Sequence, residues 1–254
     1  MSDGVTPAAP GPEVTSIVVP AFNEARGLPA TLASIRRATV ALDARGWRHE
    51  LIVCDNNSTD GTGAVARAAG ATVVFEPVNQ ISRARNTGAA HATGDWLLFV
   101  DADSHPPPEL FADVAETIAK GRCLAGGATV AVDSTDRLAR ATVAVWNAIS
   151  RSTRLAAGSF IFCDAHAFRQ VGGFSLELYA TEELELFKRL KRLARRTGRT
   201  IVILHDHPLV TSDRKARLYT KGEMTIGLLK SALTLGRAMR NRDDCYMWYD
   251  GRRE

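Results

Sequence analysis

The stretch LLFVDADS, residues 97–104, ends an apolar run with two carboxylates one residue apart. The run has the length and composition of a buried strand, and Asp101 and Asp103 follow at its carboxyl end. Open α/β sheets bind their ligands at that edge. Carboxylate oxygens suit Mg²⁺ or Mn²⁺, and such an ion suits a diphosphate. A strand that merely ends in solvated turn residues shows the same pattern, so the motif alone leaves both interpretations open.

Before this stretch, apolar runs alternate with helical patterns. Buried strands are predicted at residues 16–22, 50–55, 71–76 and 95–101, and helices at 28–46, 58–70 and 83–94. Strands that alternate with helices pair in parallel, because each crossover carries a helix back across the sheet. The order therefore predicts an α/β fold of Rossmann-like type, with a mostly parallel sheet and helices on both faces.

The pattern changes after residue 104, where the segment HPPPEL (105–110) interrupts the chain. Further strands are predicted at 123–133, 158–168 and 199–204, and helices at 111–121, 135–152, 181–198 and roughly 215–240. We expect a single domain over residues 14–254. Its nucleotide-binding half is expected at 14–104, the half for the second substrate at 105–214, and a C-terminal helical region at 215–254.

The composition is that of a folded protein, since 45% of the 254 residues are hydrophobic and 24% are charged. It excludes a collagen, a coiled-coil rod and a chain disordered throughout. The net charge of +4 is too small to indicate nucleic acid, and four cysteines without a C-x-x-C pair do not indicate a zinc site. Residues 1–13 are typical of a disordered tail rather than a secretory signal, and no apolar stretch reaches the ~18–20 residues of a membrane span. The cytoplasm is the expected location.

Two other predicted strands also end in polar residues. In PAFNE (20–24), Pro20 ends the first strand, and Asn23 and Glu24 are placed to cap the helix that follows. Asp55 lies just past the second strand, where a carboxylate can accept a hydrogen bond from the N–H of a nucleotide base. A helix cap explains the first set of residues, and a simple turn explains Asp55, without any ligand.

The same region contains a glycine pattern like that of dinucleotide-binding proteins. Gly61-x-Gly63-x-x-Ala66 is followed by Glu76 at the end of the next strand. In a true fingerprint the glycines directly follow the strand and the acidic residue lies about 20 residues further on. Here several polar residues intervene and the acid is nearer, so we disfavour a dinucleotide site.

Taken together, these segments resemble the family 2 glycosyltransferases of the GT-A fold. The matching segments are PAFNE, CDNNSTDGT, RARNTGAAHATGDWLLFVDADS, VGGF and TEELELFKRL, and the resemblance covers roughly residues 14–215. It implies a hexosyltransferase that moves a sugar from a nucleoside-diphosphate sugar, with UDP favoured, to a hydroxyl acceptor. The donor-binding residues that it implies are Pro20, Phe22, Asn23, Glu24, Asp55, Arg85, Asp101, Ala102 and Asp103. Among these, Asp101 and Asp103 would hold Mn²⁺ or Mg²⁺.

The sequence departs from the family pattern at two places. Asn56 replaces the second Asp of the loop after the second strand, which leaves Asp55 matched. The family's Glu-Asp pair is Glu182-Glu183, so the resemblance implies Glu182 at the acceptor and Glu183 as the catalytic base, one methylene longer than the usual Asp. Acidic residues at a helix N-terminus, with Thr181 as N-cap, explain the same segment without catalysis.

The implied chemistry is one direct displacement that inverts the anomeric carbon. An acceptor hydroxyl has a pKa far above neutral, so it needs a base positioned to take its proton. The departing diphosphate gains negative charge, which a divalent ion neutralises. Because these groups act on opposite faces of the sugar, the reaction inverts its configuration.

Basic and histidine clusters leave further questions open. The run KRLKRLARR (188–196) fits a solvated helix face, or a surface for an anionic acceptor or a membrane. His205 and His207 are predicted to follow a strand, where one of them would join Asp103 at the metal. The basic run TSDRKAR (211–217) would clamp the diphosphate or simply begin the last helix.

Alternatives also remain for the binding partner of the C-terminal region and for the class of activity. The apolar spacing in residues 215–254 fits packing on the body or a homodimer partner, and a lipid-linked acceptor would bring peripheral contact with the inner face of the membrane. One alternative activity is a non-catalytic sugar-nucleotide-binding protein that lost its base. Another is a phosphatase of the haloacid dehalogenase type, which also carries D-x-D after an apolar strand but normally on the first strand of the chain.

Overall fold

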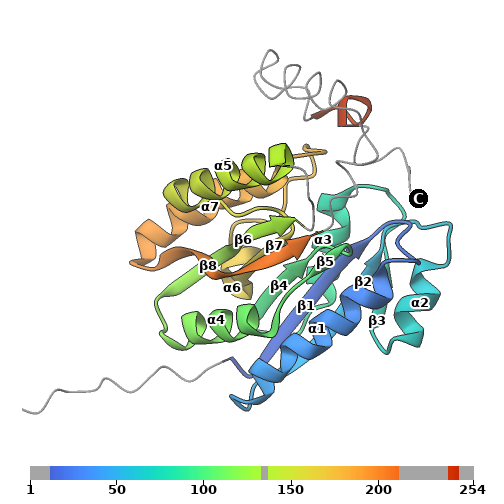
Figure 1. Ribbon diagram of the computed structural model, residues 1–254, viewed down its shortest axis with the longest axis horizontal. Coiled ribbons are helices and arrows are strands. Elements are labelled where there is room, and N and C mark those ends of the chain that lie inside the picture. The colour runs from blue at the N-terminus through green and yellow to red at the C-terminus, as the bar shows by residue number, and fades with distance from the viewer. Residues whose placement is uncertain (1–11, 133–136, 212–239, 246–254) are drawn as a thin grey trace, which may run out of the picture.

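A computed structural model of the chain describes residues 12–132, 137–211 and 240–245 (Figure 1). The strands are β1 (Val14–Ala21), β2 (Arg48–Asp55), β3 (Thr72–Phe75), β4 (Trp96–Val100), β5 (Ser104–His105), β6 (Cys123–Val132), β7 (Phe160–Asp164) and β8 (Thr200–Thr211). The helices are α1 (Leu28–Asp43), α2 (Thr62–Ala68), α3 (Ile81–His91), α4 (Pro108–Ala119), α5 (Arg137–Thr153), α6 (Ala165–Gln170), α7 (Glu182–Thr197) and a 3₁₀ turn at Asp243–Cys245.

The strands form one sheet in the order β3-β2-β1-β4-β7-β6-β8-β5. The first four strands in this order are parallel, and β6 and β8 are parallel to each other. Only β7 and the short β5 pair antiparallel with their neighbours. The expected mostly parallel α/β sheet is therefore confirmed. The order reverses direction beside β1, so the carboxyl ends of β1 and β4 open onto the edge where such sheets bind ligands.

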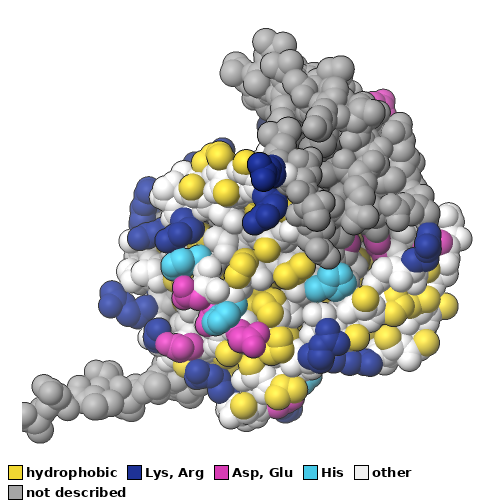
Figure 2. Space-filling view, in the orientation of Figure 1, with side chains coloured by type: hydrophobic (Ala, Val, Ile, Leu, Met, Phe, Trp, Pro, Cys, Tyr) yellow, Lys and Arg dark blue, Asp and Glu magenta, His cyan; other side chains and the backbone are white. Residues whose placement is uncertain are grey.

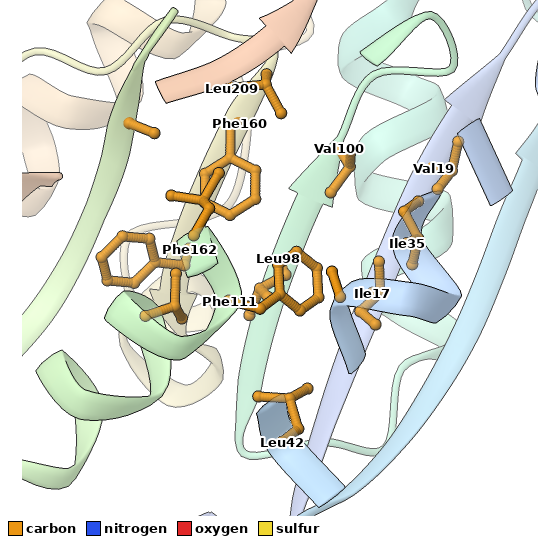
Figure 3. Packing of buried hydrophobic residues seen from close by; sticks show 14 of the residues in the cluster. Ile17, Val19, Ile35, Leu42, Leu98, Val100, Phe111, Phe160, Phe162 and Leu209 are labelled. Atoms are coloured by element: carbon orange, nitrogen blue, oxygen red, sulfur yellow. The ribbon is translucent and has the colours of Figure 1, made fainter. Parts of the chain in front are cut away.

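Apolar residues of the central strands alternate between two cores, one on each face of the sheet. In β4, Leu98 packs with α1 and α4, as Figure 3 shows around Ile35 and Phe111. Its neighbour Phe99 points to the other face, into the core built by α3, α6 and α7, where its ring lies 5.3 Å from that of Phe168. Continuous apolar runs therefore become strands buried on both faces, which fixes the polar ends of β1, β2 and β4 at one edge.

Two elements differ from the sequence expectation, and a third falls mostly outside the described residues. Strand β8 continues to Thr211, so His205 and His207 lie within a strand and not after it. Helix α6 begins directly after β7, because the Asp164 side chain accepts a hydrogen bond from the amide of Ala167 and caps the new helix. Most of the helix expected at roughly 215–240 lies outside the described residues. Among the helices that are described, none combines the length and the apolarity needed to cross a bilayer.

Candidate functional site

The loops that follow β1 and β2 are joined by hydrogen bonds. The amide of Asn23 donates to Ser58 Oγ (3.0 Å), and the amide of Thr59 donates to Asn23 Oδ1 (2.8 Å). The amide of Glu24 donates to Thr62 Oγ1 (2.8 Å). Asn23 adopts a left-handed conformation with φ 53°, which asparagine tolerates better than most residues. The two loops therefore form one rigid rim at the carboxyl edge of the sheet.

The interpretation of Asn23 and Glu24 as side-chain caps of α1 is wrong. Helix α1 has Gly27 at its N-cap position, and no side-chain hydrogen bond caps it among the described residues. The backbone carbonyl of Glu24 instead accepts from the amides of Gly27 and Leu28. The side chain of Asn23 is used to hold the neighbouring loop, because a loop-to-loop contact formed through tertiary packing replaces the local cap.

Asp55 stands at the end of β2 with α2 directly against it. Its Oδ1 accepts a hydrogen bond from the amide of Ser58 (3.0 Å). A Cβ on Gly63 would lie only 2.7 Å from Asp55 Oδ2, so glycine is required there for α2 to approach. Gly61, at φ 85°, turns the chain into α2. The fold therefore explains why glycine stands at both positions, without any bound dinucleotide.

Asn56 has a structural role that explains the first departure from the family pattern. Its side chain is buried, and its amide nitrogen donates to the carbonyls of Glu76 (3.2 Å) and Val78 (2.7 Å). Its oxygen accepts from the amide of Gln80 (2.9 Å). An ionised aspartate has no donors for the two carbonyls. The amide therefore fixes the loop that leads into α3.

We predict that Asn56→Asp lowers the free energy of unfolding by about 1–3 kcal/mol, because the carbonyls of Glu76 and Val78 lose their donor and face a buried carboxylate. Urea unfolding at neutral pH measures the change. The matched control is Asn57→Asp, at the exposed neighbouring position. If the two variants unfold at the same urea concentration, the buried amide does not stabilise this loop.

Arg85 of α3 lies at the centre of a carboxylate cluster. It is 1% exposed, and its Nη1 donates to Glu182 Oε1 (2.5 Å). Its Nη2 donates to Asp101 Oδ1 (2.8 Å) and to the carbonyl of Gly158 (2.8 Å). The guanidinium lies 5.2 Å from the centre of the Phe174 ring. One cation thus links the ends of β4 and α7, which the sequence pattern did not reveal.

Two of the segments that carry the family resemblance are packed against each other. Asn86 follows Arg85, and its side chain donates to the carbonyl of Phe174 (2.8 Å) and accepts from the amide of Phe174 (2.9 Å). Gly173 has φ 66°, and a Cβ there would lie 2.7 Å from Asn86 Oδ1. Glycine at position 173 therefore allows the close contact between Asn86 and Phe174. This contact holds the Phe174 ring beside Arg85.

Asp101 and Asp103 emerge on the same side after β4. Both are partly exposed, whereas Ala102 between them is buried and its carbonyl accepts from Thr31 Oγ1 (2.7 Å). The amide of Ser104 donates to the carbonyl of Asp101 (3.1 Å), so residues 101–104 form a turn that leaves both acids partly exposed. The amide of Asp101 donates to the carbonyl of Ser159, which joins this turn to the segment before β7. Asp101 and Asp103 thus lie just past the end of β4, and their role as metal ligands stays a prediction.

The histidines of β8 do not form a three-residue metal cluster with these acids. Within the residues that the structure describes, no group of three or more His, Cys, Asp or Glu side chains is arranged to hold a metal. His207 Nδ1 contacts Asp113 of α4 (2.8 Å). Asp101 and Asp103 remain the candidate ligands, and a divalent ion bound by two carboxylates normally completes its shell with water and phosphate oxygens.

Glu182 and Glu183 begin α7, beside Arg85. Glu182 is buried and paired with Arg85, whereas Glu183 lies next to Gly158, where an added Cβ would be 3.5 Å from the Glu183 carboxyl carbon. Burial, followed by the Glu182 carboxylate, raises the pKa of Glu183 to about 8. Thr181 occupies the N-cap position of α7, as expected, but it adopts φ 61° and its side chain makes no capping hydrogen bond within the described part of the chain.

The charges around Arg85 do not balance. Three carboxyl groups, those of Asp101, Glu182 and Glu183, surround one guanidinium, and their charges hold the pKa of Arg85 above its usual range. Glu182 and Asp101 bond the cation directly, whereas Glu183, whose pKa burial raises to about 8, holds its proton at neutral pH. A carboxyl group of raised pKa next to further carboxylates is a typical candidate for a catalytic group.

Comparisons with known proteins give the same assignment for most of the chain. Residues 16–173 match the family model described as glycosyl transferase family 2. The chain is 30% identical over 164 residues to the undecaprenyl-phosphate 4-deoxy-4-formamido-L-arabinose transferase of Klebsiella pneumoniae (strain 342), which covers 61% of this chain and 48% of that protein. It therefore spans about half the length of this relative. Glu182 and Glu183 lie beyond the matched residues.

Solved structures show the same fold at low identity. The mannosyltransferase PcManGT from Pyrobaculum calidifontis, in complex with GDP-Man and Mn²⁺, has a TM-score of 0.65 at 21% identity, covering 92% of this chain and 66% of that one. Glucosyl-3-phosphoglycerate synthase from Mycobacterium tuberculosis, in complex with Mn²⁺, UDP and phosphoglyceric acid, has a TM-score of 0.58 at 23% identity, covering 87% and 78%.

Proposed function

Because this chain belongs to glycosyl transferase family 2, we propose that it transfers a sugar from a nucleoside-diphosphate sugar to a hydroxyl acceptor, with inversion and with Glu183 as the base. The observation that carries the proposal is the cluster in which Arg85 joins Asp101 to Glu182, with Glu183 beside them. The cluster combines carboxylate oxygens, which suit a divalent ion that would bind a diphosphate, with Glu183, a carboxyl group of raised pKa. The phosphatase alternative loses its basis, because the D-x-D motif lies on the fourth strand of a family 2 chain.

The donor is expected to bind along the rim formed by the loops after β1, β2 and β4. The joined loops that contain Asn23 and Asp55 offer polar groups for the base and ribose. The partly exposed pair Asp101 and Asp103 fits Mn²⁺ or Mg²⁺ by its carboxylate oxygens and its place at the sheet edge. Such an ion, when bound, would neutralise charge on the leaving diphosphate.

On the acceptor side, Glu183 would take the proton of the attacking hydroxyl. Arg85 would position this reaction through its two carboxylate partners, because it fixes the start of α7 to the turn after β4. Glu182 is paired with Arg85, and burial together with the Glu182 carboxylate raises the pKa of Glu183 to about 8. A base with a pKa near the working pH is well matched to general-base catalysis.

We predict that a correct donor, added at about 100 times its Kd together with Mn²⁺, stabilises the fold by about 2.7 kcal/mol. Thermal unfolding with UDP-, GDP- and dTDP-sugars identifies the base of the donor. The control variant Asp103→Asn should lose the part of the shift that depends on Mn²⁺. An equal shift with and without the metal, in both proteins, would argue against a metal-bridged diphosphate.

Turnover separates the enzyme from a non-catalytic sugar-nucleotide-binding protein. A relative named for undecaprenyl-phosphate makes a lipid phosphate one acceptor to test, and a place at the inner face of the membrane would suit such an acceptor. Release of nucleoside diphosphate with any acceptor, or its slow release with water, supports the transferase. Tight donor binding without release across the acceptor panel supports the binding protein.

A further inference from the structure

Helix α5 turns an apolar strip toward solvent. A helix on a protein surface normally buries its apolar side and exposes its polar side. In α5, Val145 is 61% exposed and Ile149 is 45% exposed. Ala141 and Ala148 are exposed on the same side, since their spacing from Val145 and Ile149 brings all four to one face. We call these four residues the apolar strip.

The same helix holds only positive charge. Residues 137–153 contain no acidic residue. Arg137, Arg140, Arg151 and the adjoining Arg154 are all exposed and border the apolar strip. Figure 2 shows apolar side chains over α5 with Lys and Arg on either side. An outward apolar face bordered by arginines is the pattern of a helix that lies in a lipid interface.

Positive charge continues from α5 onto α7. Lys191 of α7 donates to the carbonyl of Thr153, which places the two helices side by side (Figure 1). After partial burial, the nearby charges of Arg195 and Arg154 lower the pKa of Lys191. Lys188 and Arg192 are exposed on the same half of α7. The result is a dense basic area at one end of the apolar strip.

An open hollow lies at that end of α5. Its volume is about 390 Å³, and it is lined by Arg151 and Arg154, by Ile201 and Ile203 of β8, and by His205. Arginine forks match phosphate geometry, and the isoleucines provide an apolar wall. A hollow with these two kinds of lining suits the phosphate headgroup and first carbons of an anionic lipid.

We propose that the apolar strip, its arginine border and the basic half of α7 form a docking surface for an anionic lipid bilayer. The strip would enter the level of the headgroups while the arginines meet lipid phosphates. A second copy of this chain fits less well, because a twofold contact through α5 would bring arginines of the two copies together with no acidic partner on either helix. The inference does not depend on the proposed transferase activity, since it concerns binding alone.

The chain connects this surface to the candidate site. Directly after α5, it runs through Leu155 to Gly158, whose carbonyl accepts from Arg85 and which lies next to Glu183. Ser159 then accepts from the amide of Asp101. The segment after α5 therefore leads from the docking surface to Glu183. An acceptor held in the bilayer would approach Glu183 from this side of the molecule.

Vesicle co-sedimentation of the full chain, without nucleotide or metal, tests the proposal. We expect binding to vesicles of phosphatidylcholine mixed with phosphatidylglycerol, and little binding to phosphatidylcholine alone. Arg140→Gln/Arg151→Gln should weaken the partition by about fivefold for each arginine. Val145→Asn/Ile149→Asn should weaken it by about tenfold, because the strip no longer enters the apolar boundary. Binding should also fall as salt is raised above about 0.1 M.

The matched control uses α1, which lies on a different side of the molecule (Figure 1). Val40 is 61% exposed, as Val145 is, and Arg37 is an exposed arginine. Val40→Asn/Arg37→Gln should bind vesicles like the unmodified protein. Circular dichroism checks that each variant is folded. Arg140→Gln/Arg151→Gln changes no apolar residue, so it tests the contribution of charge to vesicle binding separately from that of the apolar strip.

Three results would overturn the docking surface. The first is equal binding to neutral and anionic vesicles. The second is a loss of binding in the α1 variant as large as that in the α5 variants. The third is a dimer in lipid-free sedimentation that Val145→Asn/Ile149→Asn converts to a monomer, which would assign the strip to a protein interface. Loss of transferase activity in any variant leaves the vesicle result unaffected, so the two proposals fail separately.

Discussion

Replacing Glu183 with glutamine is expected to lower kcat by about 10²–10⁴-fold on the true acceptor, because the amide cannot take the proton of the hydroxyl. Donor binding should stay within a few-fold of normal, since Arg85 holds Asp101 and Glu182 without using Glu183. Single-turnover measurements with saturating donor separate the chemical step from binding. Glu183→Asp restores a carboxylate at shorter reach and is expected to be more active than the glutamine variant.

The raised pKa gives this prediction a second readout. Between the usual carboxyl range and pH 8, native Glu183 holds a proton that the unfolded chain has released. The native state thus binds more protons in this window, so wild-type stability falls as the pH rises through it. Glu183→Gln should remove this fall and leave the variant more stable than wild type at pH 8. The wild-type kcat/KM should rise with pH in the same window, because the base must lose its proton.

The control for Glu183 is an acid outside the cluster. Glu177→Gln changes an exposed carboxylate whose ion pair with Arg240 is at the surface. It should alter neither kcat nor the pH dependence of stability. Near-wild-type turnover in Glu183→Gln would remove Glu183 from the role of base. A loss of activity accompanied by a loss of stability would instead indicate a structural role.

Arg85→Met should destabilise the fold by about 3–5 kcal/mol, the cost of leaving the other members of a buried ionic cluster unpaired. It removes the cation that bonds both Asp101 and Glu182. Arg85→Lys keeps the charge, but an ammonium lacks the planar fork that reaches Glu182, Asp101 and the carbonyl of Gly158 together. We expect the lysine variant to fold and to lose activity. Urea unfolding and kcat together measure both effects.

A double-mutant cycle tests whether the charges act as a unit. Glu182→Gln in the Arg85→Met background removes one of the unpaired carboxylates, so it should recover part of the lost stability, whereas in the wild-type background it should destabilise. Arg37→Met, at an exposed position of α1, is the control and should be nearly neutral. Additive effects of Arg85→Met and Glu182→Gln would contradict the close ion pair.

Much of the donor half could be predicted from local pattern. Apolar runs of strand length give β1 to β4, and nearly every residue of β1 and β4 is buried, which requires apolar side chains on both faces. The partial exposure of Asp101 and Asp103 follows from their position in the turn directly after β4. These features depend on residues close together in the chain, so the sequence carries them directly.

Other features involve segments far apart, which no local pattern registers. The sequence predicted that His205 and His207 follow a strand. In the structure, β8 pairs with β6 as far as Thr211, so both histidines lie within the strand. In the sequence, Asn56 is a departure from the family's second Asp. Its role is set by the carbonyls of Glu76 and Val78, which lie 20 and 22 positions away in the chain.

By itself, the sequence determined a mostly parallel α/β sheet with carboxylates at its ligand-binding edge, because hydrophobic periodicity and strand ends are local properties of the chain. Only the tertiary structure decided the protonation of Glu183, which lies beside those carboxylates. Arg85 reaches Glu182 across 97 positions and Asp101 across 16, and the pKa of Glu183 depends on the burial and the charges gathered there. Protonation is set by the surrounding dielectric and by nearby charges, and both exist only after distant segments have packed.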